Sequence, residues 1–188
     1  STMHLSMEFG LTYRQIEKDG FIIDEKIENL LSSDTKSSIA KSTGLAMILL
    51  SDALKRLDPD IILILGDRYE THAAATTATL MNIPIAHIHG GEITEGAVDE
   101  QIRHSITKMS YLHFTSTEAY KNRVIQMGED PVRVFSTGAP GIDNIVMMNL
   151  LGKEDLENEL SWKMNSPIAL FTYHSETLSS SDEIENIL

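Results

Sequence analysis

The stretch from His87 to Lys108, HIHGGEITEGAVDEQIRHSITK, holds the densest group of reactive side chains in the chain. It contains three histidines, four carboxylates, one arginine and a Gly-Gly pair, directly after an apolar stretch that begins at Ile83. A buried strand that ends in such a loop delivers polar groups to the rim of a sheet, where glycines let the backbone turn tightly. Because a purely structural loop rarely needs so many titratable groups, we interpret this stretch as part of a catalytic or ligand-binding site.

A second polar group, Gly66-Asp67-Arg68, follows the continuous apolar run Ile61–Leu65. That run is typical of a strand buried on both faces, and open α/β sheets bind ligands at the carboxyl ends of such strands. Asp67 is therefore a candidate base, or the residue that orients one, with capping of the next helix as the alternative. Arg68 is a candidate partner for a phosphate or for Glu70.

His87 and His89 lie two residues apart, so they share one face of a strand and could bind a metal together. Glu92 and Asp99 are the acidic residues that could complete such a site. Acidic side chains near histidines are also common at sites without metal, and we expect no metal here. His87 fits a core position, whereas His89 lies nearer the rim and is the better functional candidate.

Gly90 and Gly91 allow a positive φ and the close approach of a ligand to the backbone. The sequence contains neither a GxGxxG motif nor a GxxxxGK[ST] phosphate loop, which argues against an ordinary dinucleotide site and against a P-loop. Asp99 and Arg103 follow at a helical i,i+4 spacing. They form either a helix-surface ion pair or, at the helix N-terminus, an ionised base held in place by the arginine.

A similar pattern returns near the end of the chain, where FTYHSE (Phe171–Glu176) places polar residues after an apolar run. His174 in this motif is a candidate acid or phosphate partner. The motif is short and unspecific, so an ordinary surface histidine is the alternative.

The composition excludes several functional classes. The net charge is −13 over 188 residues and the pI is about 4.8, so the chain lacks the basic face that a nucleic-acid partner requires. It has no cysteine, which excludes disulfides and thiolate catalysis. No apolar run approaches the ~20 residues of a membrane span, and the first residues do not resemble a signal peptide. We expect a cytoplasmic protein with neither membrane nor nucleic-acid partners.

Apolar periodicity predicts alternating strands and helices, which is typical of an α/β fold with a parallel sheet and flanking helices. The expected strands are Phe21–Ile23, Ile61–Leu65, Ile83–Ile88, Leu112–Thr115 and Val132–Phe135. The expected helices are Leu11–Asp19, a long helix capped by Asp34 or Thr35 and ending at Leu57, Tyr69–Met81, Val98–Met109, Glu118–Met127 and Ile142–Met148. Because helices separate most of the strands, neighbouring strands should pair in parallel.

The pattern changes after residue 150. Asn149–Asn165 is polar and acidic and is predicted to form a linker helix, Pro167–Thr172 a strand, and Glu183–Leu188 the start of a helix. A strand and half a helix cannot bury a core of their own, so we expect the chain to be a piece of a longer protein. The predicted division is a domain over 1–150, a linker helix over 151–166 and the opening of a second domain over 167–188.

Five motifs occur in order: GDRYE (Gly66–Glu70), HIHGGE (His87–Glu92), DEQIRHSITKMS (Asp99–Ser110), LHFTSTEAYKNRVIQMGEDP (Leu112–Pro131) and GAPGIDNI (Gly138–Ile145). Together they resemble the UDP-N-acetylglucosamine 2-epimerases, and most closely the hydrolysing branch of the sialic-acid pathway. The resemblance implies the N-terminal half of a two-domain glycosyltransferase-B architecture, built from Rossmann-like domains with the active site between them. By this resemblance, we expect the chain to lack the family's first strand and most of its second domain, which carries the uridine and diphosphate contacts.

The resemblance also implies roles for individual residues. Asp67 matches a catalytic aspartate, Asp99 an acidic residue of the proton-transfer machinery, and Arg103 its arginine partner. His174 matches a histidine close to the leaving diphosphate. Some relatives carry a catalytic glutamate where this chain has His89, so Glu92 is expected to take over part of that role. The residues expected to contact the substrate are Arg68, His89, Gly90, Gly91 and Arg103.

The activity implied by the resemblance is hydrolysis with inversion at C2 of the sugar. UDP-N-acetylglucosamine, or a diacetamido-dideoxy relative, would give a free N-acetylmannosamine-type sugar and UDP through a glycal intermediate. The resemblance implies no metal and no cofactor, and we expect a homo-oligomer, either a dimer or a tetramer. Two alternatives stay open, a non-hydrolysing 2-epimerase that keeps UDP on its product and a non-catalytic fragment that binds a nucleotide sugar.

Overall fold

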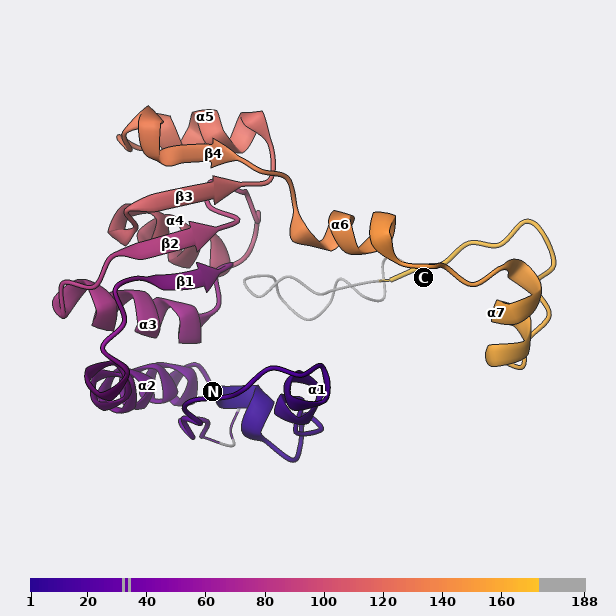
Figure 1. Cartoon of the computed structure of the whole chain (residues 1–188), viewed down its shortest axis with the longest axis horizontal. Coiled ribbons are helices and arrows are strands. Elements are labelled where there is room, and N and C mark those ends of the chain that lie inside the picture. Colours follow the sequence, from indigo (N-terminus) through magenta and orange to yellow (C-terminus); the bar gives the residue numbers. More distant parts are fainter. Residues whose placement is uncertain (32, 34, 173–188) are drawn as a thin grey trace.

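A four-stranded parallel sheet forms the centre of the protein. The computed structural model describes residues 1–31, 33 and 35–172. The strands are β1 (Ile62–Leu65), β2 (Ile85–Ile88), β3 (Leu112–Thr115) and β4 (Val134–Ser136), and they lie side by side in chain order (Figure 1). All three pairs of neighbouring strands are parallel, which confirms the predicted α/β fold.

Helices connect the strands and flank the sheet. The connecting helices are α3 (Tyr69–Leu80), α4 (Asp99–Met109) and α5 (Glu118–Gln126), with the short η2 (Pro131–Arg133) before β4. Ahead of the sheet lie η1 (Thr2–Leu5), α1 (Tyr13–Lys18) and α2 (Lys36–Leu57), and after it come α6 (Pro140–Met147) and α7 (Lys153–Glu159). Helix α2 packs against α3, and α6 and α7 extend away from the sheet (Figure 1).

Helix α2 begins where the sequence predicts. The Thr35 hydroxyl accepts a hydrogen bond from the Ser38 backbone N–H at 3.2 Å, which satisfies one of the free amides of the first turn. No helix in the described part of the chain is both long and apolar enough to cross a membrane.

One face of the sheet is covered by α3, α4 and α5. The side chains that point toward these helices from the four strands form a row of register partners, and their exposed fractions are 4 % or less: Ile64, His87, His113 and Val134. The hydrophobic part of the core joins Ile64 and Ile85 to Leu54 of α2 and Ile106 of α4. The core therefore lies between the sheet and its helices, below the loops at the strand ends.

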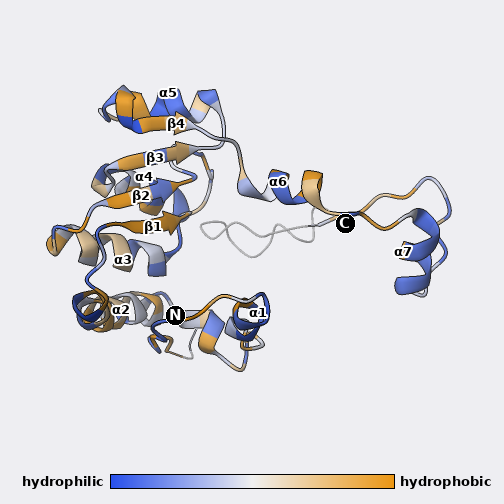
Figure 2. Cartoon of the chain, in the orientation of Figure 1, coloured by the Kyte–Doolittle hydropathy of each residue, from blue (hydrophilic) through white to orange (hydrophobic). Residues whose placement is uncertain are grey.

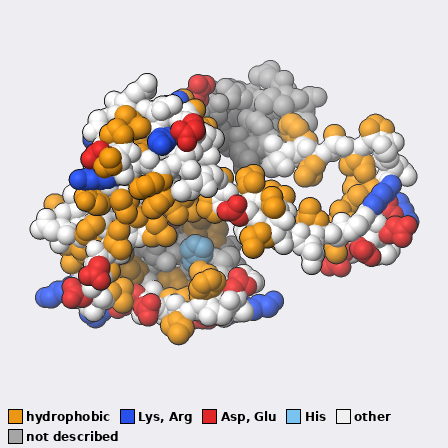
Figure 3. All heavy atoms as spheres, turned by 45° about the horizontal axis from the view of Figure 1, so that its top comes forward, with side chains coloured by type: hydrophobic (Ala, Val, Ile, Leu, Met, Phe, Trp, Pro, Cys, Tyr) orange, Lys and Arg blue, Asp and Glu red, His pale blue; other side chains and the backbone are white. Residues whose placement is uncertain are grey.

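The opposite face of the sheet is exposed along β1. Leu63 and Leu65 of β1 are 67 % and 57 % exposed, so the prediction of a strand buried on both faces is wrong for this chain. The cause is the placement of the connecting helices, which all pack on the side of Ile64. The strands are coloured as hydrophobic in Figure 2, and Figure 3 shows hydrophobic side chains gathered on the molecular surface.

Two predicted strands do not form. Residues Phe21–Ile23 are irregular, with Phe21 and Ile22 67 % and 87 % exposed, and Pro167–Thr172 is also irregular, with Leu170 94 % exposed. A strand forms only when its backbone pairs with a neighbouring strand, and neither segment has one in the described structure. The predicted linker helix is present only as α7, Lys153–Glu159. The helix predicted over 183–188 lies outside the described residues.

Candidate functional site

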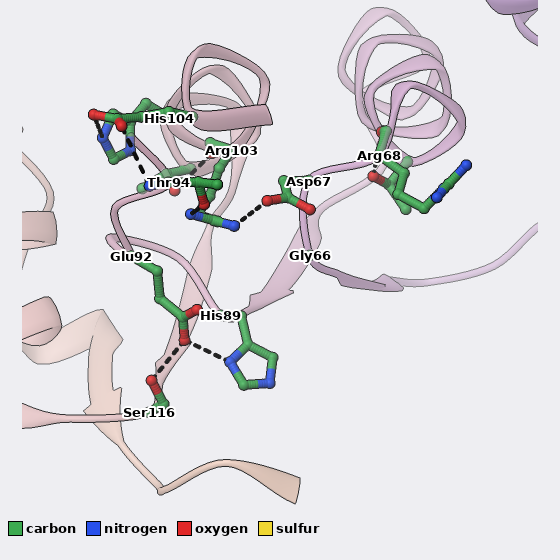
Figure 4. A network of polar contacts seen from close by, with 12 residues as sticks. Gly66, Asp67, Arg68, His89, Glu92, Thr94, Arg103, His104 and Ser116 are labelled. Atoms are coloured by element: carbon green, nitrogen blue, oxygen red, sulfur yellow. Dashed lines mark hydrogen bonds and ion pairs between the residues drawn. The ribbon is translucent and has the colours of Figure 1, made fainter. Parts of the chain in front are cut away.

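The loops after β1 and β2 meet at one edge of the sheet, because parallel strands end on the same side (Figure 4). The first loop carries Asp67 directly after Gly66, whose φ of +80° suits glycine. The second loop runs from His89 to Thr94. The N-terminal half of α4 follows and adds Arg103 to the same group. The structure thus brings Asp67 and His89, from two separate strand ends, to the edge where Arg103 of α4 also lies.

An ion pair between Asp67 and Arg103 joins the first loop to α4. An Nη2–H of Arg103 donates to Asp67 Oδ2, and Nη1 donates to Thr94 Oγ1 at 2.9 Å. The Arg103 side chain is 8 % exposed and that of Asp67 19 %. Among the described residues no ion pair joins Arg103 to Asp99, so the expectation that Arg103 holds Asp99 is wrong, because the guanidinium reaches across to the β1 loop instead.

The environment of Asp67 makes its carboxyl a weaker acid than usual. Burial raises the pKa of Asp67, and the negative charges of Asp99 and Glu92 act in the same direction against the opposing effect of Arg103. A carboxyl group with a raised pKa exchanges protons more readily near neutral pH, which suits a group that transfers a proton.

Glu92 forms a second polar group with His89 and Ser116. Glu92 Oε1 lies 2.6 Å from His89 Nδ1 and accepts a hydrogen bond from Ser116 Oγ, also at 2.6 Å (Figure 4). Burial by itself raises the pKa of the Glu92 carboxyl, but the hydrogen bonds from Ser116 and His89 outweigh it, and the net pKa is lowered. Sequence reasoning missed Ser116, whose only signal is its position directly after β3.

Buried His87 supports both loops from below. Its Nε2 lies 2.8 Å from the Gly66 carbonyl, and its Nδ1 lies 3.3 Å from the Thr107 hydroxyl of α4. The imidazole is 0 % exposed, which confirms the core assignment made from the sequence. Burial lowers the pKa of His87 to about 4, so the ring is neutral at physiological pH and Nε2–H donates to the carbonyl oxygen.

The Gly-Gly pair in the second loop is required by packing. A Cβ on Gly90 would lie 3.1 Å from Thr107 Oγ1 and 3.2 Å from His87 Nδ1. A Cβ on Gly91, whose φ is +78°, would lie 2.5 Å from the Tyr120 carbonyl oxygen. These two glycines let the loop pass closely over His87 and α5, which holds the residues on either side of them in place.

The structure places other predicted site residues differently. Arg68 pairs with Glu70 at 3.3 Å, one of its two predicted partners, and its side chain is directed away from Asp67 (Figure 4). Arg68, not Asp67, is the N-cap residue of α3, so the capping alternative for Asp67 is wrong. Asp99 is the first residue of α4, half-buried, and its charge reaches Asp67. His174 lies outside the described residues.

Within the described part of the chain, no group of three or more histidine and acidic side chains could hold a metal ion. The site instead contains one aspartate–arginine pair and one glutamate–histidine pair. Such a set can move protons between bound groups and fix a negatively charged ligand.

The family model for UDP-N-acetylglucosamine 2-epimerase matches residues 1–188 of the sequence. The chain belongs to this epimerase family. A GDP/UDP-N,N'-diacetylbacillosamine 2-epimerase (hydrolyzing) from Campylobacter jejuni is 50 % identical over 98 % of the chain and 49 % of the relative. A UDP-N,N'-diacetylbacillosamine 2-epimerase (hydrolyzing) from Legionella pneumophila is 39 % identical over 92 % of the chain and 45 % of the relative. The chain therefore spans about half the length of these curated relatives.

Solved structures of the epimerase family share the fold. The Methanocaldococcus jannaschii UDP-GlcNAc 2-epimerase in complex with UDP-GlcNAc and UDP superposes with a TM-score of 0.66 at 22 % identity, over 77 % of this chain and 39 % of that one. UDP-N-acetylglucosamine 2-epimerase from Rickettsia bellii gives a TM-score of 0.63 at 23 % identity, over 82 % and 42 %. The predicted glycosyltransferase-B type of fold is thus confirmed, with this chain covering the N-terminal part.

The tight packing of the Gly-Gly loop leads to a stability prediction. Gly91→Ala should lower the free energy of unfolding by about 2 kcal/mol or more, because the new Cβ meets the Tyr120 carbonyl and alanine disfavours a positive φ. Gly44→Ala, in an open position of α2, should instead raise it by about 0.5–1 kcal/mol. Urea unfolding of both variants measures the difference. Equal effects of the two substitutions would contradict the packing described for this loop.

Buried His87 leads to a prediction on pH. Its pKa falls from the ordinary 6.5 to about 4 on folding, so the unfolded chain binds a proton more readily. The resulting stability is present above pH 6.5 and is lost as the pH falls toward about 4. Lowering the pH from about 7 to about 5.5 should therefore reduce the free energy of unfolding by about 1 kcal/mol through this histidine. Urea unfolding at both pH values should show that loss in the wild type and a smaller one in His87→Gln; identical losses would contradict it.

Proposed function

We propose that the gene-encoded protein that contains this chain is a hydrolysing UDP-sugar 2-epimerase. The observation that carries the proposal is the meeting of two proton-transfer pairs, Asp67–Arg103 and His89–Glu92, at the edge where the β1 and β2 loops come together. The high identity to relatives named as hydrolysing 2-epimerases supports the same reaction.

The chemistry of the reaction explains why such a site needs two proton-transfer groups. The C2–H bond of the sugar breaks while UDP leaves C1 with the electron pair of the C1–O bond, which gives a 2-acetamidoglucal. Water then adds at C1, and C2 receives a proton on its other face. One group must therefore accept a proton at C2 and a second group must supply one from the opposite side.

Asp67, Asp99 and Glu92 are the carboxyl groups available for these tasks. The raised pKa of Asp67 supports a role in proton transfer, and Arg103 keeps the Asp67 carboxyl in position. Asp99, at the N-terminus of α4, adds negative charge next to Asp67. We assign further contacts with the sugar to the backbone of Gly90 and Gly91.

The negative diphosphate requires positive charge, which we assign mainly to a second domain. The proposed division keeps 1–150 as the first Rossmann-like domain, 151–166 as the linker and 167–188 as the start of the second. His174 would then approach the leaving diphosphate from that second domain. Arg68 is a further candidate for the diphosphate if its side chain leaves Glu70 when substrate binds.

We further propose a UDP-2,4-diacetamido sugar as the preferred substrate, in place of UDP-N-acetylglucosamine. Two of the relatives carry UDP-N,N'-diacetylbacillosamine in their names, one of them 50 % identical to this chain. A cytoplasmic location and a homo-oligomeric state, dimer or tetramer, complete the proposal. Both properties are compatible with an enzyme that consumes an activated nucleotide sugar.

Product analysis in deuterated water tests the reaction. The gene-encoded protein is incubated with UDP-N,N'-diacetylbacillosamine and, separately, with UDP-N-acetylglucosamine. We expect free 2-epimerised sugar with one deuterium at C2, together with UDP, and faster turnover of the diacetamido substrate. A product that keeps UDP would indicate the non-hydrolysing reaction, product without deuterium would contradict proton transfer at C2, and no product at all would contradict the proposed activity.

A substitution at Asp67 tests its part in the reaction. Asp67→Asn should lower kcat by about 10²- to 10⁴-fold, because an amide cannot exchange the proton that the carboxyl transfers. Asp60→Asn removes the same charge from an exposed residue before β1, at the other end of the strand, and should leave kcat unchanged. Steady-state kinetics on both variants decides between these outcomes. Full activity in Asp67→Asn would remove Asp67 from the reaction.

A further inference from the structure

The pair of His89 and Glu92 has a geometry that distinguishes the roles of its two members. Glu92 Oε1 is already occupied by two donors, His89 Nδ1 and Ser116 Oγ, each at 2.6 Å. The three side chains come from two loops, since His89 and Glu92 follow β2 and Ser116 follows β3. The Glu92 carboxylate is thus held by donors from both loops.

The carboxylate determines which nitrogen of His89 carries the proton. The hydrogen bonds from Ser116 and His89 lower the pKa of Glu92 below its ordinary value despite burial, so the carboxylate is ionised at neutral pH and can only accept. A contact of 2.6 Å between Nδ1 and this carboxylate therefore requires a proton on Nδ1. In the neutral imidazole, Nε2 then carries the lone pair and accepts protons.

His89 Nε2 is the atom of this group that remains available. It has no hydrogen-bond partner among residues 1–31, 33 and 35–172, and the side chain is 23 % exposed. Figure 4 shows the ring beside Glu92, at the strand-end edge that also carries the Asp67–Arg103 pair.

The backbone holds His89 in an uncommon conformation. Its φ is +68°, a region that residues other than glycine seldom adopt, although asparagine, aspartate and histidine do so more often than other residues. The His89 N–H donates to the Phe114 carbonyl at 2.9 Å, so the residue is anchored to β3 while its side chain turns toward the site. A strained residue that its surroundings hold firmly in place is typical of functional sites.

We propose that His89 is a catalytic residue that accepts the C2 proton through Nε2, with Glu92 and Ser116 as positioning residues. This inference rests on the proposed function. Nε2 takes the proton as the C2–H electron pair forms the C1–C2 double bond and UDP leaves with the C1–O pair. The imidazolium keeps Nδ1–H on the Glu92 carboxylate, which stabilises its charge, and later releases the Nε2 proton to water. Asp67, whose pKa is raised, returns a proton to C2 and recovers one from the water that adds at C1.

Variants of the gene-encoded protein separate these roles. His89→Asn keeps a side chain that tolerates positive φ and an amide N–H for Glu92, but it has no counterpart of Nε2. We expect its kcat to fall about 10²- to 10⁴-fold, with KM within about threefold of the wild type. Ser116→Ala should lower kcat by about tenfold through a less well-oriented Glu92. Ser105→Ala, which removes a hydroxyl bonded to the Ile102 carbonyl of α4, is the matched control and should retain activity.

Nitrogen-15 NMR of labelled histidine provides a readout that does not depend on activity. In the wild type we expect the neutral form of His89 to carry its proton on Nδ1 and none on Nε2. Glu92→Gln should shift this preference toward a mixture of tautomers. A wild-type His89 with its proton on Nε2 would overturn the proposal, and so would an active His89→Asn variant. A wild type that turns over neither substrate would overturn the proposed function and the catalytic role together, while the tautomer would still report the Glu92 contact.

Discussion

The ion pair between Asp67 and Arg103 is the contact on which the candidate site depends, because it ties the loop after β1 to helix α4. Arg103 is almost fully buried, and its second donor holds Thr94 of the loop after β2. Removing either partner would leave a charge in a half-buried position without compensation, which commonly costs several kcal/mol. This pair therefore helps to hold the two loops and the helix in a fixed arrangement.

Below the pair, uncharged groups provide the rigid base. Neutral His87 bonds the Gly66 carbonyl and contacts Thr107, so it links the loop that carries Asp67 to the helix that carries Arg103. Gly90 passes within contact distance of both His87 and Thr107. A charged histidine here would need a costly desolvation, which explains why burial keeps the ring neutral. Packing in this layer thus positions the titratable groups that lie above it.

Much of the fold and part of the site could be predicted from the sequence. Apolar runs separated by helical periodicity gave the parallel sheet, and parallel strands necessarily bring Asp67 and His89 to one edge. The partner of Arg103 could not be predicted, because i,i+4 spacing favours Asp99 while the fold brings Asp67 closer. Ser116 could not be predicted either, because its only signal in the sequence is its position directly after β3. Apolar residues at 21–23 and 167–172 resemble strands, but a strand also needs a neighbour, which local sequence does not reveal.

The most direct test of the account is a crystal structure of the gene-encoded protein with a bound UDP-sugar. The account predicts the pyranose ring above the Gly90-Gly91 loop, with C2 about 3–3.5 Å from His89 Nε2 on one face and the Asp67 carboxyl on the other. The Glu92 carboxylate would remain bonded to His89 Nδ1 and Ser116. A sugar bound away from this edge, or one whose C2 faces neither residue, would contradict the account.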